Sequence, residues 1–562
     1  MRRVNVAFWL LGLCVFGVFA YINWRYVDVQ FLEYTMGDEF PQFLQLQKMY
    51  EALLEHDIKK FFAFEFYNYG FLWYVANLIV VLPFKIFPNY ELAIYAPRML
   101  NAFFAIALLA MIYKIARLYL SPKLSLLFCV FAVAMPGFWK VGYTFKPDTF
   151  QALLLLCCVY YLCRDNFAFG RFYRYGIVLF GLALGAAKFQ AVMFLPLVYG
   201  YIFYLFATSP GVRTLLQVVK KSALATLAIF VLWIVTNPYL LHPRGFLAWL
   251  SMFRGNMNSN ATNHGSYIDV GIAQKIFEVV DFYYFALVVF CVLVLVCAML
   301  SFRALQILLG RARQDWQRYD VFIPIALSFA ISMLYLFVQV NKAWEVYYFS
   351  SICFGILLFI PFVLALNAAF TESRARSKGA LAKIALGGGA FSMLIALEIF
   401  GGIYNHAYAR VLEKYPRDLQ AIYEQSDKLA TLLAPYFEAM EPPFTLLIDT
   451  PLAYLRFGLE PKHIYRPYGR LNPEGFVYEE WSKKPHTFPF VPKDFIILRK
   501  DSAFFSESKR PHIISQDLEQ SLHTLKELQA GTLPYEKILD TEDFVVFKNL
   551  NTSHKGAEYG QK

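Results

Sequence analysis

The sequence predicts an α-helical polytopic membrane protein of about eleven transmembrane helices, followed by a small C-terminal α/β domain on the outer face of the membrane. Of its 562 residues, 58% are hydrophobic and 17% are charged, whereas soluble proteins are about half apolar and about a quarter charged. Long apolar runs recur up to about residue 404, and charges and prolines return from 405 onward. We therefore divide the chain into a membrane domain, 1–404, and a soluble domain, 405–562.

The net charge of +11 comes from 52 Lys and Arg against 41 Asp and Glu. The basic residues lie in short loops between apolar runs, which indicates membrane topology and not nucleic-acid binding, so we expect no nucleic-acid partner. No cysteine follows Cys353, which leaves the tail without a disulfide framework or a Cys-based metal site. The first apolar run lacks a small-residue cleavage site after it, and we interpret it as an uncleaved span.

The predicted spans are 5–23, 92–117, 124–139, 149–163, 175–187, 190–206, 222–240, 279–302, 321–340, 347–366 and 384–404. Two segments are ambiguous: 71–87 is apolar enough to span, and 175–206 could be one long helix or a hairpin that turns at 185–188. The positive-inside rule decides both, with 71–87 lying flat in the interface and 175–206 forming a hairpin. The basic loops at 114–123, 164–174, 213–221, 303–318 and 374–383 then share the side of Arg2 and Arg3. This arrangement places the N-terminus inside and the tail outside.

The first outer loop, 24–91, is predicted to hold two interfacial helices, around 38–56 and 71–87, on either side of an aromatic turn. Residues 42–56 place their apolar side chains on one helical face, which suits the membrane surface. In the tail, 408–437 has helical spacing, while 445–449, 494–498 and 544–547 are short β-type runs. The last run is expected to form a hairpin with 535–540.

Polar residues near the predicted membrane boundaries all fall on the outer side. Each has a simple structural interpretation: Asp148 is a favourable first residue for a helix, Lys188 can reach the interface with its ammonium, and Asn237-Pro238 ends a helix. Charged groups next to a bilayer are costly, however, and their restriction to one face indicates a site at the outer surface.

The order of these features resembles that of the GT-C membrane glycosyltransferases, most of all the protein O-mannosyltransferase and aminoarabinose–lipid A transferase branch. The resemblance covers about 1–405. It is carried by Asp38-Glu39 at the start of the outer loop, Pro97-Arg98-Met99-Leu100-Asn101-Ala102, Lys146-Pro147-Asp148, Ala187-Lys188, Asn237-Pro238-Tyr239-Leu240-Leu241, and Tyr347 with Phe349. The chain departs from the family at 65–70, where many members have a basic or Pro-rich turn.

The resemblance implies a GT-C fold and the transfer of a sugar, hexosyl or pentosyl, from a polyprenyl-phosphate carrier to a lipid, glycan or protein acceptor. The reaction would take place at the outer face of the lipid bilayer, in a bacterial inner membrane. Asp38 is expected to act as the base for the acceptor hydroxyl, with Glu39 orienting the acceptor or a metal. Cations would bind the phosphate, and the substrate-binding candidates are Arg98, Lys146, Asp148, Lys188, Asn68, Lys342 and His242.

A divalent metal, Mg or Mn, could be held by Asp38 and Asp148, because hard cations take carboxylate oxygens. The resemblance leaves metal dependence open, since relatives differ in this respect. The alternatives are a polytopic transporter or flippase of a lipid or glycan, and a non-catalytic membrane assembly factor. A transporter would place ionisable residues near the middle of the bilayer, between repeated halves. This chain has them at the ends of its spans.

Overall fold

The computed structural model describes residues 2–25, 39–62, 69–84, 90–261, 270–311, 314–376, 385–438, 446–448, 464–465, 479–480, 484–485, 494–500, 523 and 525–551. Asp38 and Asn68, two of the predicted site residues, lie outside this set. The chain forms two compact units. The first comprises Met1–Val27, Pro41–Phe253 and Val270–Glu413, and the second comprises Asp28–Phe40, Arg254–Asp269 and Lys414–Lys562.

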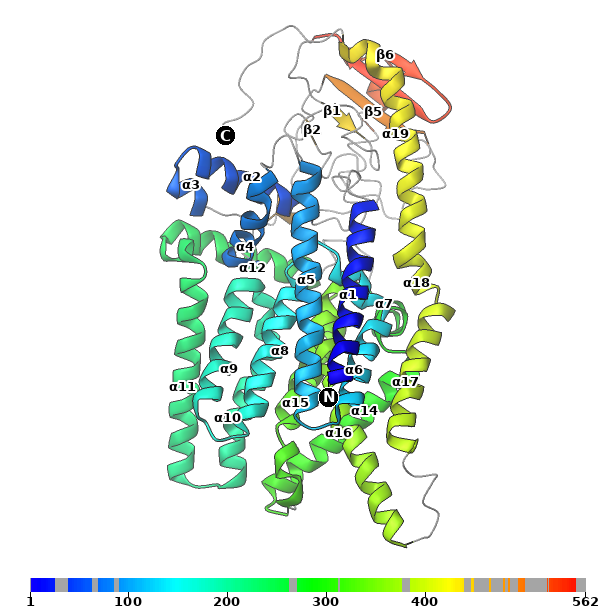
Figure 1. Cartoon of the computed structure of the whole chain (residues 1–562). Helices are drawn as coiled ribbons and strands as arrows, with labels where there is room; N and C mark the ends of the chain where they lie inside the picture. Colours follow the sequence, from blue (N-terminus) through cyan, green and yellow to red (C-terminus); the bar gives the residue numbers. More distant parts are fainter. Residues whose placement is uncertain are drawn as a thin grey trace. The chain divides into compact units, whose positions relative to one another are not determined.

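Helices make up nearly all of the first unit (Figure 1). They are α1 (Arg2–Arg25), α2 (Glu39–Leu54), α3 (Ile58–Phe62), α4 (Phe71–Val81), α5 (Tyr90–Arg117), α6 (Pro122–Ala134), α7 (Pro136–Gly142), α8 (Asp148–Asp165), α9 (Arg171–Leu182), α10 (Leu195–Thr208), α11 (Val212–Val235), α12 (Pro243–Ala261), α13 (Ile272–Lys275), α14 (Leu287–Leu308), α15 (Phe322–Val338), α16 (Glu345–Arg376), α17 (Ala385–Tyr404) and α18 (Ala407–Ala409), where α2 and α12 each carry a few residues of the second unit. Among the described residues, three segments are π-helical: η3 (Ala183–Ala187), η6 (Ile276–Tyr284) and η8 (Arg410–Lys414).

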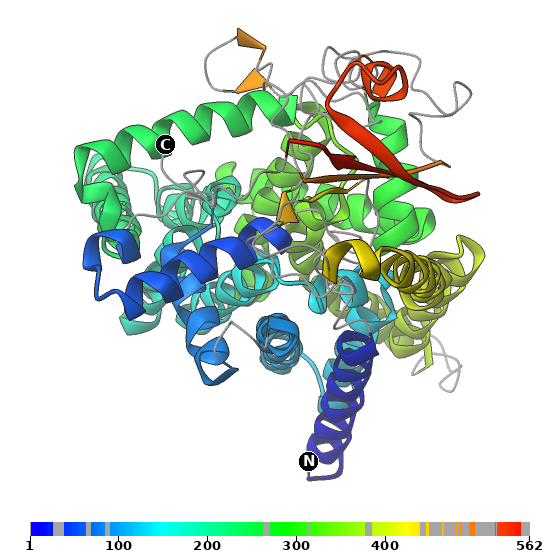
Figure 2. The same cartoon turned by 90° about the horizontal axis from the view of Figure 1, so that it is seen from above.

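Seven helical segments in the described residues are long and apolar enough to cross a membrane, and an eighth would be the bent pair α6 and α7. The seven are Val6–Trp24, Leu92–Arg117, Phe189–Thr208, Val212–Val235, Leu287–Leu308, Gln317–Val338 and Glu345–Ala368. Shorter apolar helices occupy Phe71–Phe84 and Gly388–Tyr404. The chain is therefore a multi-pass membrane protein, and the predicted number of eleven spans stays a prediction. In the view from above, the blue helix α5 is seen end-on (Figure 2).

The prediction of a hairpin within 175–206 agrees with the structure. The α9 helix passes into η3, and Lys188 then adopts an extended conformation before the chain turns into α10. Tyr173, near the start of α9, stacks on Tyr201 in the middle of α10 with ring centroids 6.1 Å apart. Because these two residues lie at similar distances along the chain before and after Lys188, the two segments run antiparallel and Lys188 lies at the tip.

Two predicted spans are broken in ways that the apolar pattern did not predict. The segment 124–139 bends by 75° between α6 and α7, where Pro136 lacks the N–H that would continue the helix. The segment 279–302 is interrupted at Phe285, which is extended, and at Ala286, which is not helical, so its long helix begins at Leu287. The freed N–H of Ala286 donates to both carboxylate oxygens of Glu398, each at 3.2 Å.

The second unit contains α19 (Tyr415–Glu438) and a five-stranded sheet in the order β2-β1-β5-β7-β6. Its strands are β1 (Leu446–Ile448), β2 (Ile464–Tyr465), β5 (Phe495–Arg499), β6 (Tyr535–Asp540) and β7 (Phe544–Asn549), while β3 (Glu479–Glu480) and β4 (Lys484–Pro485) pair separately. The predicted helix and the predicted β6–β7 hairpin are both confirmed. Phe437 of α19 packs against Phe495 with ring centroids 5.1 Å apart, which joins the helix to the sheet.

An exposed charge cluster lies at the end of the β6–β7 hairpin. The Asp540 carboxylate accepts hydrogen bonds from the ammonium groups of Lys500 and Lys537, at 2.6 Å and 2.7 Å. These two bonds lower the pKa of Asp540 to about 2, because they favour its ionised form. The bond from Lys500 has the larger effect.

Candidate functional site

The centre of the site is a buried ion pair between Asp148 and Lys188. The Lys188 ammonium donates to Asp148 Oδ1 at 2.7 Å, and their side chains are 8% and 2% exposed respectively. The second carboxylate oxygen, Oδ2, is buried and has no hydrogen-bond partner among the described residues. The pair therefore holds one oxygen ready to accept a further hydrogen bond or a positive charge.

Local backbone geometry brings these two residues together. Asp148 is the first residue of α8, where a carboxylate is stabilised by the positive end of the helix dipole. Lys188 follows the π-turn η3, and its extended backbone forms a bridge with Tyr69. Gly70 makes this crossing possible, because a Cβ at that position would overlap backbone atoms of Gly185 and Ala186.

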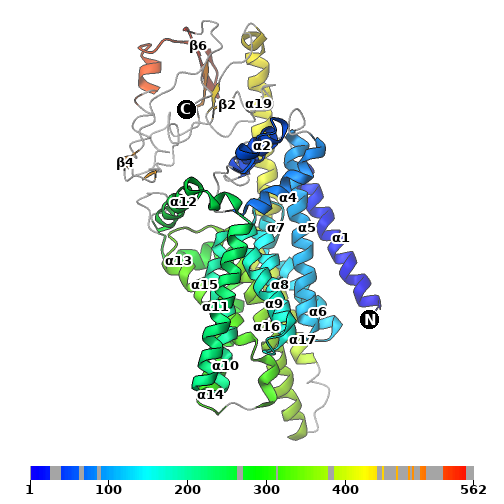
Figure 3. The same cartoon turned by 90° about the vertical axis from the view of Figure 1, so that its left-hand side faces the viewer.

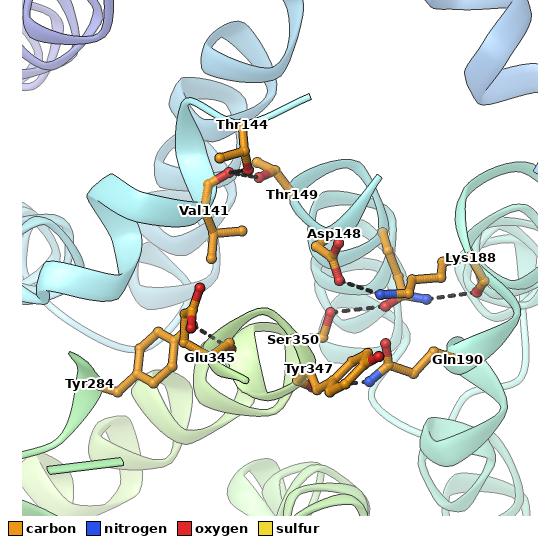
Figure 4. Close-up of polar contacts among 11 residues, drawn as sticks. Val141, Thr144, Asp148, Thr149, Lys188, Gln190, Tyr284, Glu345, Tyr347 and Ser350 are labelled. Atoms are coloured by element: carbon orange, nitrogen blue, oxygen red, sulfur yellow. Dashed lines mark hydrogen bonds and ion pairs between the residues drawn. The ribbon is translucent and has the colours of Figure 1, made fainter. Parts of the chain in front are cut away.

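Two aromatic rings flank the Lys188 ammonium, and Figure 4 shows one of them, Tyr347, beside the Asp148–Lys188 pair. The ammonium lies 5.6 Å from the ring centroid of Tyr69 and 5.2 Å from that of Tyr347. Gln151, one helical turn after Asp148, donates to the Lys188 carbonyl at 2.7 Å and accepts a hydrogen bond from Ser350 at 3.2 Å. The lysine is thus fixed at both its backbone and its side chain by α8 and α16.

A second cation shares the Tyr347 ring. The Lys342 ammonium lies 6.0 Å from its centroid and 4.7 Å from that of Trp344, and Lys342 is 2% exposed. Trp344 stacks on Tyr347 with centroids 5.7 Å apart. Two buried lysines therefore approach one tyrosine ring.

A second buried ion pair joins α7 to α16. The Lys140 ammonium lies 3.0 Å from Glu345 Oε1, and Tyr284 of η6 donates to the Glu345 backbone carbonyl at 2.7 Å. The Tyr283 hydroxyl lies 3.4 Å from the same ammonium. Figure 4 shows Glu345 and Tyr284 on the α16 side of the Asp148–Lys188 pair.

The α5 helix orders the loop that precedes Asp148. The amide of Asn101 donates to the carbonyl of Thr144 at 2.7 Å and to that of Val141 at 3.1 Å. One turn earlier, Arg98 is fully buried and its guanidinium lies 5.9 Å from the Tyr143 ring centroid. Lys146, in the same loop, is 4% exposed.

The structure brings together some predicted site residues and separates others. Asp148, Lys188 and Lys342 meet around Tyr347, while Arg98 and Lys146 are buried at or next to the loop that leads into α8. Glu39 begins α2 and is buried. His242 is exposed in the turn after η5 (Pro238–Leu241), and its ring stacks on Tyr239. Among the described residues, no hydrogen bond or ring contact joins His242 to the Asp148–Lys188 pair.

The part of the chain that the structure describes does not by itself supply a metal site. It contains no group of three His, Cys, Asp or Glu side chains placed to hold an ion. Asp148 offers one carboxylate oxygen beside an ammonium group, whereas Mg²⁺ takes about six oxygen ligands and Ca²⁺ six to eight. The predicted metal site depends on Asp38, which lies outside the described residues, and it stays a prediction.

The sequence prediction did not select Tyr69, Gln151, Lys140 or Glu345 as site residues. Gln151 carried a usable signal, because a polar residue three positions after Asp148 lies on the same helical face of an otherwise apolar segment. The predicted spans put Lys140 and Glu345 in outer loops, directly after 124–139 and between 321–340 and 347–366, but nothing in their spacing connects two residues so far apart in the chain. Tyr69 had no distinguishing signal in a turn full of aromatic residues.

Residues 74–237 match the family described as dolichyl-phosphate-mannose-protein mannosyltransferase. This match confirms the predicted resemblance over the region that contains α5, Asp148, Lys188 and Asn237. No curated protein matches the chain by sequence.

Solved structures with a similar arrangement include ArnT from Cupriavidus metallidurans bound to undecaprenyl phosphate, at 12% identity and a TM-score of 0.48, covering 98% of both chains. The apo state of the same protein matches at 12% identity and a TM-score of 0.43, over 90% of this chain and 92% of that one. The oligosaccharyltransferase of Archaeoglobus fulgidus matches at 10% identity and a TM-score of 0.42, over 91% of this chain and 72% of its own.

Proposed function

We propose that this chain is a membrane glycosyltransferase that moves a sugar from a polyprenyl-phosphate donor to a lipid, glycan or protein acceptor. The single observation that carries the proposal is the buried Asp148–Lys188 pair beside Lys342, with Tyr69 and Tyr347 around it. The family match over 74–237 supports it, since both members of the pair fall in the matched region.

The chemistry that this geometry suits is departure of a phosphate. When the bond between sugar and phosphate breaks, negative charge builds on the leaving phosphate, and fixed cations in a dry site stabilise it. Lys188 is held in place by the Asp148 carboxylate and by its contacts with two aromatic rings, so little reorganisation is needed. We assign Lys188 and Lys342 to the phosphate, with Arg98 and Lys146 as further cationic candidates.

The acceptor hydroxyl must lose a proton, and for this step we retain Asp38 as base, with Glu39 beside it. Asp148 Oδ1 already accepts a hydrogen bond from the Lys188 ammonium at 2.7 Å, so we do not assign Asp148 the role of base. Its role in the proposal is to position Lys188. The ion pair also lies at the start of α8 and at the tip of the α9–α10 hairpin, which disfavours a transporter, where such groups are found near mid-membrane.

Mass spectrometry of glycolipids and glycoproteins from cells with and without the gene would test this function and identify the sugar and acceptor. We expect one glycan species to disappear without the gene. Asp38→Asn should lower turnover at least about a hundredfold, because positioned bases contribute roughly 100- to 10,000-fold. Turnover like that of the wild type would remove Asp38 as base, and removal of divalent cations with a chelator tests the metal separately.

We propose that the site faces outward across a bacterial inner membrane, with the N-terminus in the cytoplasm. The asymmetry of the basic loops supports this orientation. A cysteine introduced at Gly170 should resist a membrane-impermeant thiol reagent in intact cells, and one at Lys526 should react. The opposite pattern, measured above the background of the native cysteines, would place the site in the cytoplasm.

A further inference from the structure

The end of α8 opposite the site carries a second feature. This helix runs 18 residues from Asp148 to Asp165, which is about 27 Å at 1.5 Å per residue. The hydrocarbon core of a bilayer is about 30 Å thick. The loop after Asp165, and the start of α9 at Arg171, therefore lie at the other membrane boundary. Figure 3 shows α9 beside α8 and α11.

This loop has a fixed shape because Asp165 organises it. Asp165 Oδ1 accepts hydrogen bonds from the backbone N–H groups of Gly170 and Tyr173, at 2.9 Å and 3.2 Å. Its Oδ2 accepts from the Phe169 N–H at 2.7 Å and from the Tyr201 hydroxyl at 2.8 Å. The carboxylate is buried and already has four donors, so its charge is committed to the loop backbone and to Tyr201.

The loop backbone is also strained, which shows that its shape is imposed by its surroundings. Asn166, Phe167 and Phe169 have φ values of 45°, 61° and 55°. These values lie in the left-handed region, which residues other than glycine rarely adopt. Phe167 is held by stacking on Tyr204, with ring centroids 3.7 Å apart. Residues in such conformations persist only where the surrounding structure compensates the strain.

Two exposed arginines stack on Phe172, the second residue of α9, directly after this loop. The guanidinium of Arg164 lies 4.3 Å from the ring centroid of Phe172, and that of Arg171 lies 4.8 Å from the same centroid. Lys221 of α11 adds a third cation, 4.4 Å from the Phe169 ring. We call Arg164, Arg171, Phe172, Phe169 and Lys221 the cationic patch. Residues 166–268 contain no Asp or Glu, so this stretch of sequence supplies no carboxylate to neutralise it.

We propose that the cationic patch binds the headgroup phosphate of an anionic phospholipid in the leaflet opposite the site. Guanidinium groups pair with phosphate through two parallel hydrogen bonds, and stacking on an aromatic ring holds them in place. The neighbouring surface is apolar and exposed, at Tyr175, Val178 and Leu216, which suits acyl chains better than nucleic acid or a soluble acidic protein. Basic clusters at the end of a span are a known means of attracting anionic lipid.

The test uses the full chain in bilayer discs that contain equal amounts of phosphatidylglycerol and phosphatidylcholine, with retained lipids counted by native mass spectrometry. The wild-type chain should retain phosphatidylglycerol over phosphatidylcholine. Arg164→Gln with Arg171→Gln should reduce that preference about 10- to 30-fold, the effect expected from two basic residues at a membrane surface. Both side chains are exposed, and a melting curve checks that the double variant folds.

The matched control is Arg213→Gln with Lys220→Gln, which removes two exposed positive charges from the start of α11 without touching the Phe172 platform. It should change the preference less than about threefold. Phe172→Leu, which keeps every charge, should lower the preference because the two guanidiniums lose their common support. An equal loss in the two charge variants would mean diffuse attraction without a built site, and no lipid preference in the wild-type chain would also overturn the proposal.

Discussion

Asn237 connects three elements around Lys188, and its replacement is the most informative single change. Its side-chain amide donates to the carbonyl of Gly185 at 2.8 Å and to that of Trp233 at 2.9 Å. Its Oδ1 accepts from the N–H of Phe71 at 3.1 Å. One side chain therefore ties the π-turn before Lys188 to the start of α4 and the end of α11.

Asn237→Ala removes a hydrogen-bond partner from three backbone groups, the carbonyls of Gly185 and Trp233 and the N–H of Phe71. Trp233 keeps a second donor in the Thr236 hydroxyl at 3.3 Å, but Gly185 and Phe71 lose the amide. Leaving a buried polar group unsatisfied costs about 1–3 kcal/mol, so we expect a loss of about 2–6 kcal/mol. Asn237→Asp keeps the acceptor for Phe71 but turns an oxygen toward two carbonyls, and it should be at least as damaging.

The assay measures turnover per folded molecule, together with a thermal melt in detergent. If Asn237 acts through Lys188, Asn237→Ala should lower turnover at least about tenfold, since each 1.4 kcal/mol of lost transition-state stabilisation is a factor of ten. The same change made in a Lys188→Met background should then have little further effect. Asn405→Ala is the control, because Asn405 also donates its amide to a backbone carbonyl, that of Asp281 at 3.1 Å.

Equal losses in the wild-type and Lys188→Met backgrounds would refute this reasoning, because they would show that Asn237 does not work through the lysine. Unchanged turnover and melting in Asn237→Asp would refute it more directly. That variant keeps the size of the buried side chain but replaces its amide donor with a carboxyl oxygen.

Four further outcomes are expected. Lys188→Met should destabilise the chain by about 3–5 kcal/mol, because it leaves the Asp148 charge buried without its partner; adding Asp148→Leu should restore the melting temperature but not turnover, and restored turnover would contradict the assigned role. Gly70→Ala should lower both stability and turnover, since the new Cβ overlaps backbone atoms of the π-turn, and a neutral effect would show that the crossing is loose. The fragment 415–562 should be soluble and melt cooperatively. The pKa of Asp540 is depressed, so the contribution of its ionised carboxylate to stability is present above about pH 4 and is lost as the pH falls through about 2. Asp540→Asn should remove this acid sensitivity. Thermal melts recorded across this pH range measure the effect.

The sequence determined most of the secondary structure and the class of protein. Apolar runs specify spans because a bilayer admits only segments whose backbone hydrogen bonds are satisfied internally. The asymmetry of the basic loops was enough to favour a hairpin at 185–188 over a long helix, and alternating β-type residues located the β6–β7 hairpin. These signals are local, so they can be recognised from the amino-acid sequence alone.

Tertiary structure alone decided which polar residues meet. Lys188 and His242 both lie in turns after apolar segments, but the π-turn and Gly70 carry Lys188 to Asp148, while His242 stays exposed. Lys140 and Glu345 pair across about two hundred positions of sequence because Pro136 bends the chain and α16 begins beside it. Contacts of this kind depend on how the helices pack. That packing cannot be deduced from the local sequence around either residue.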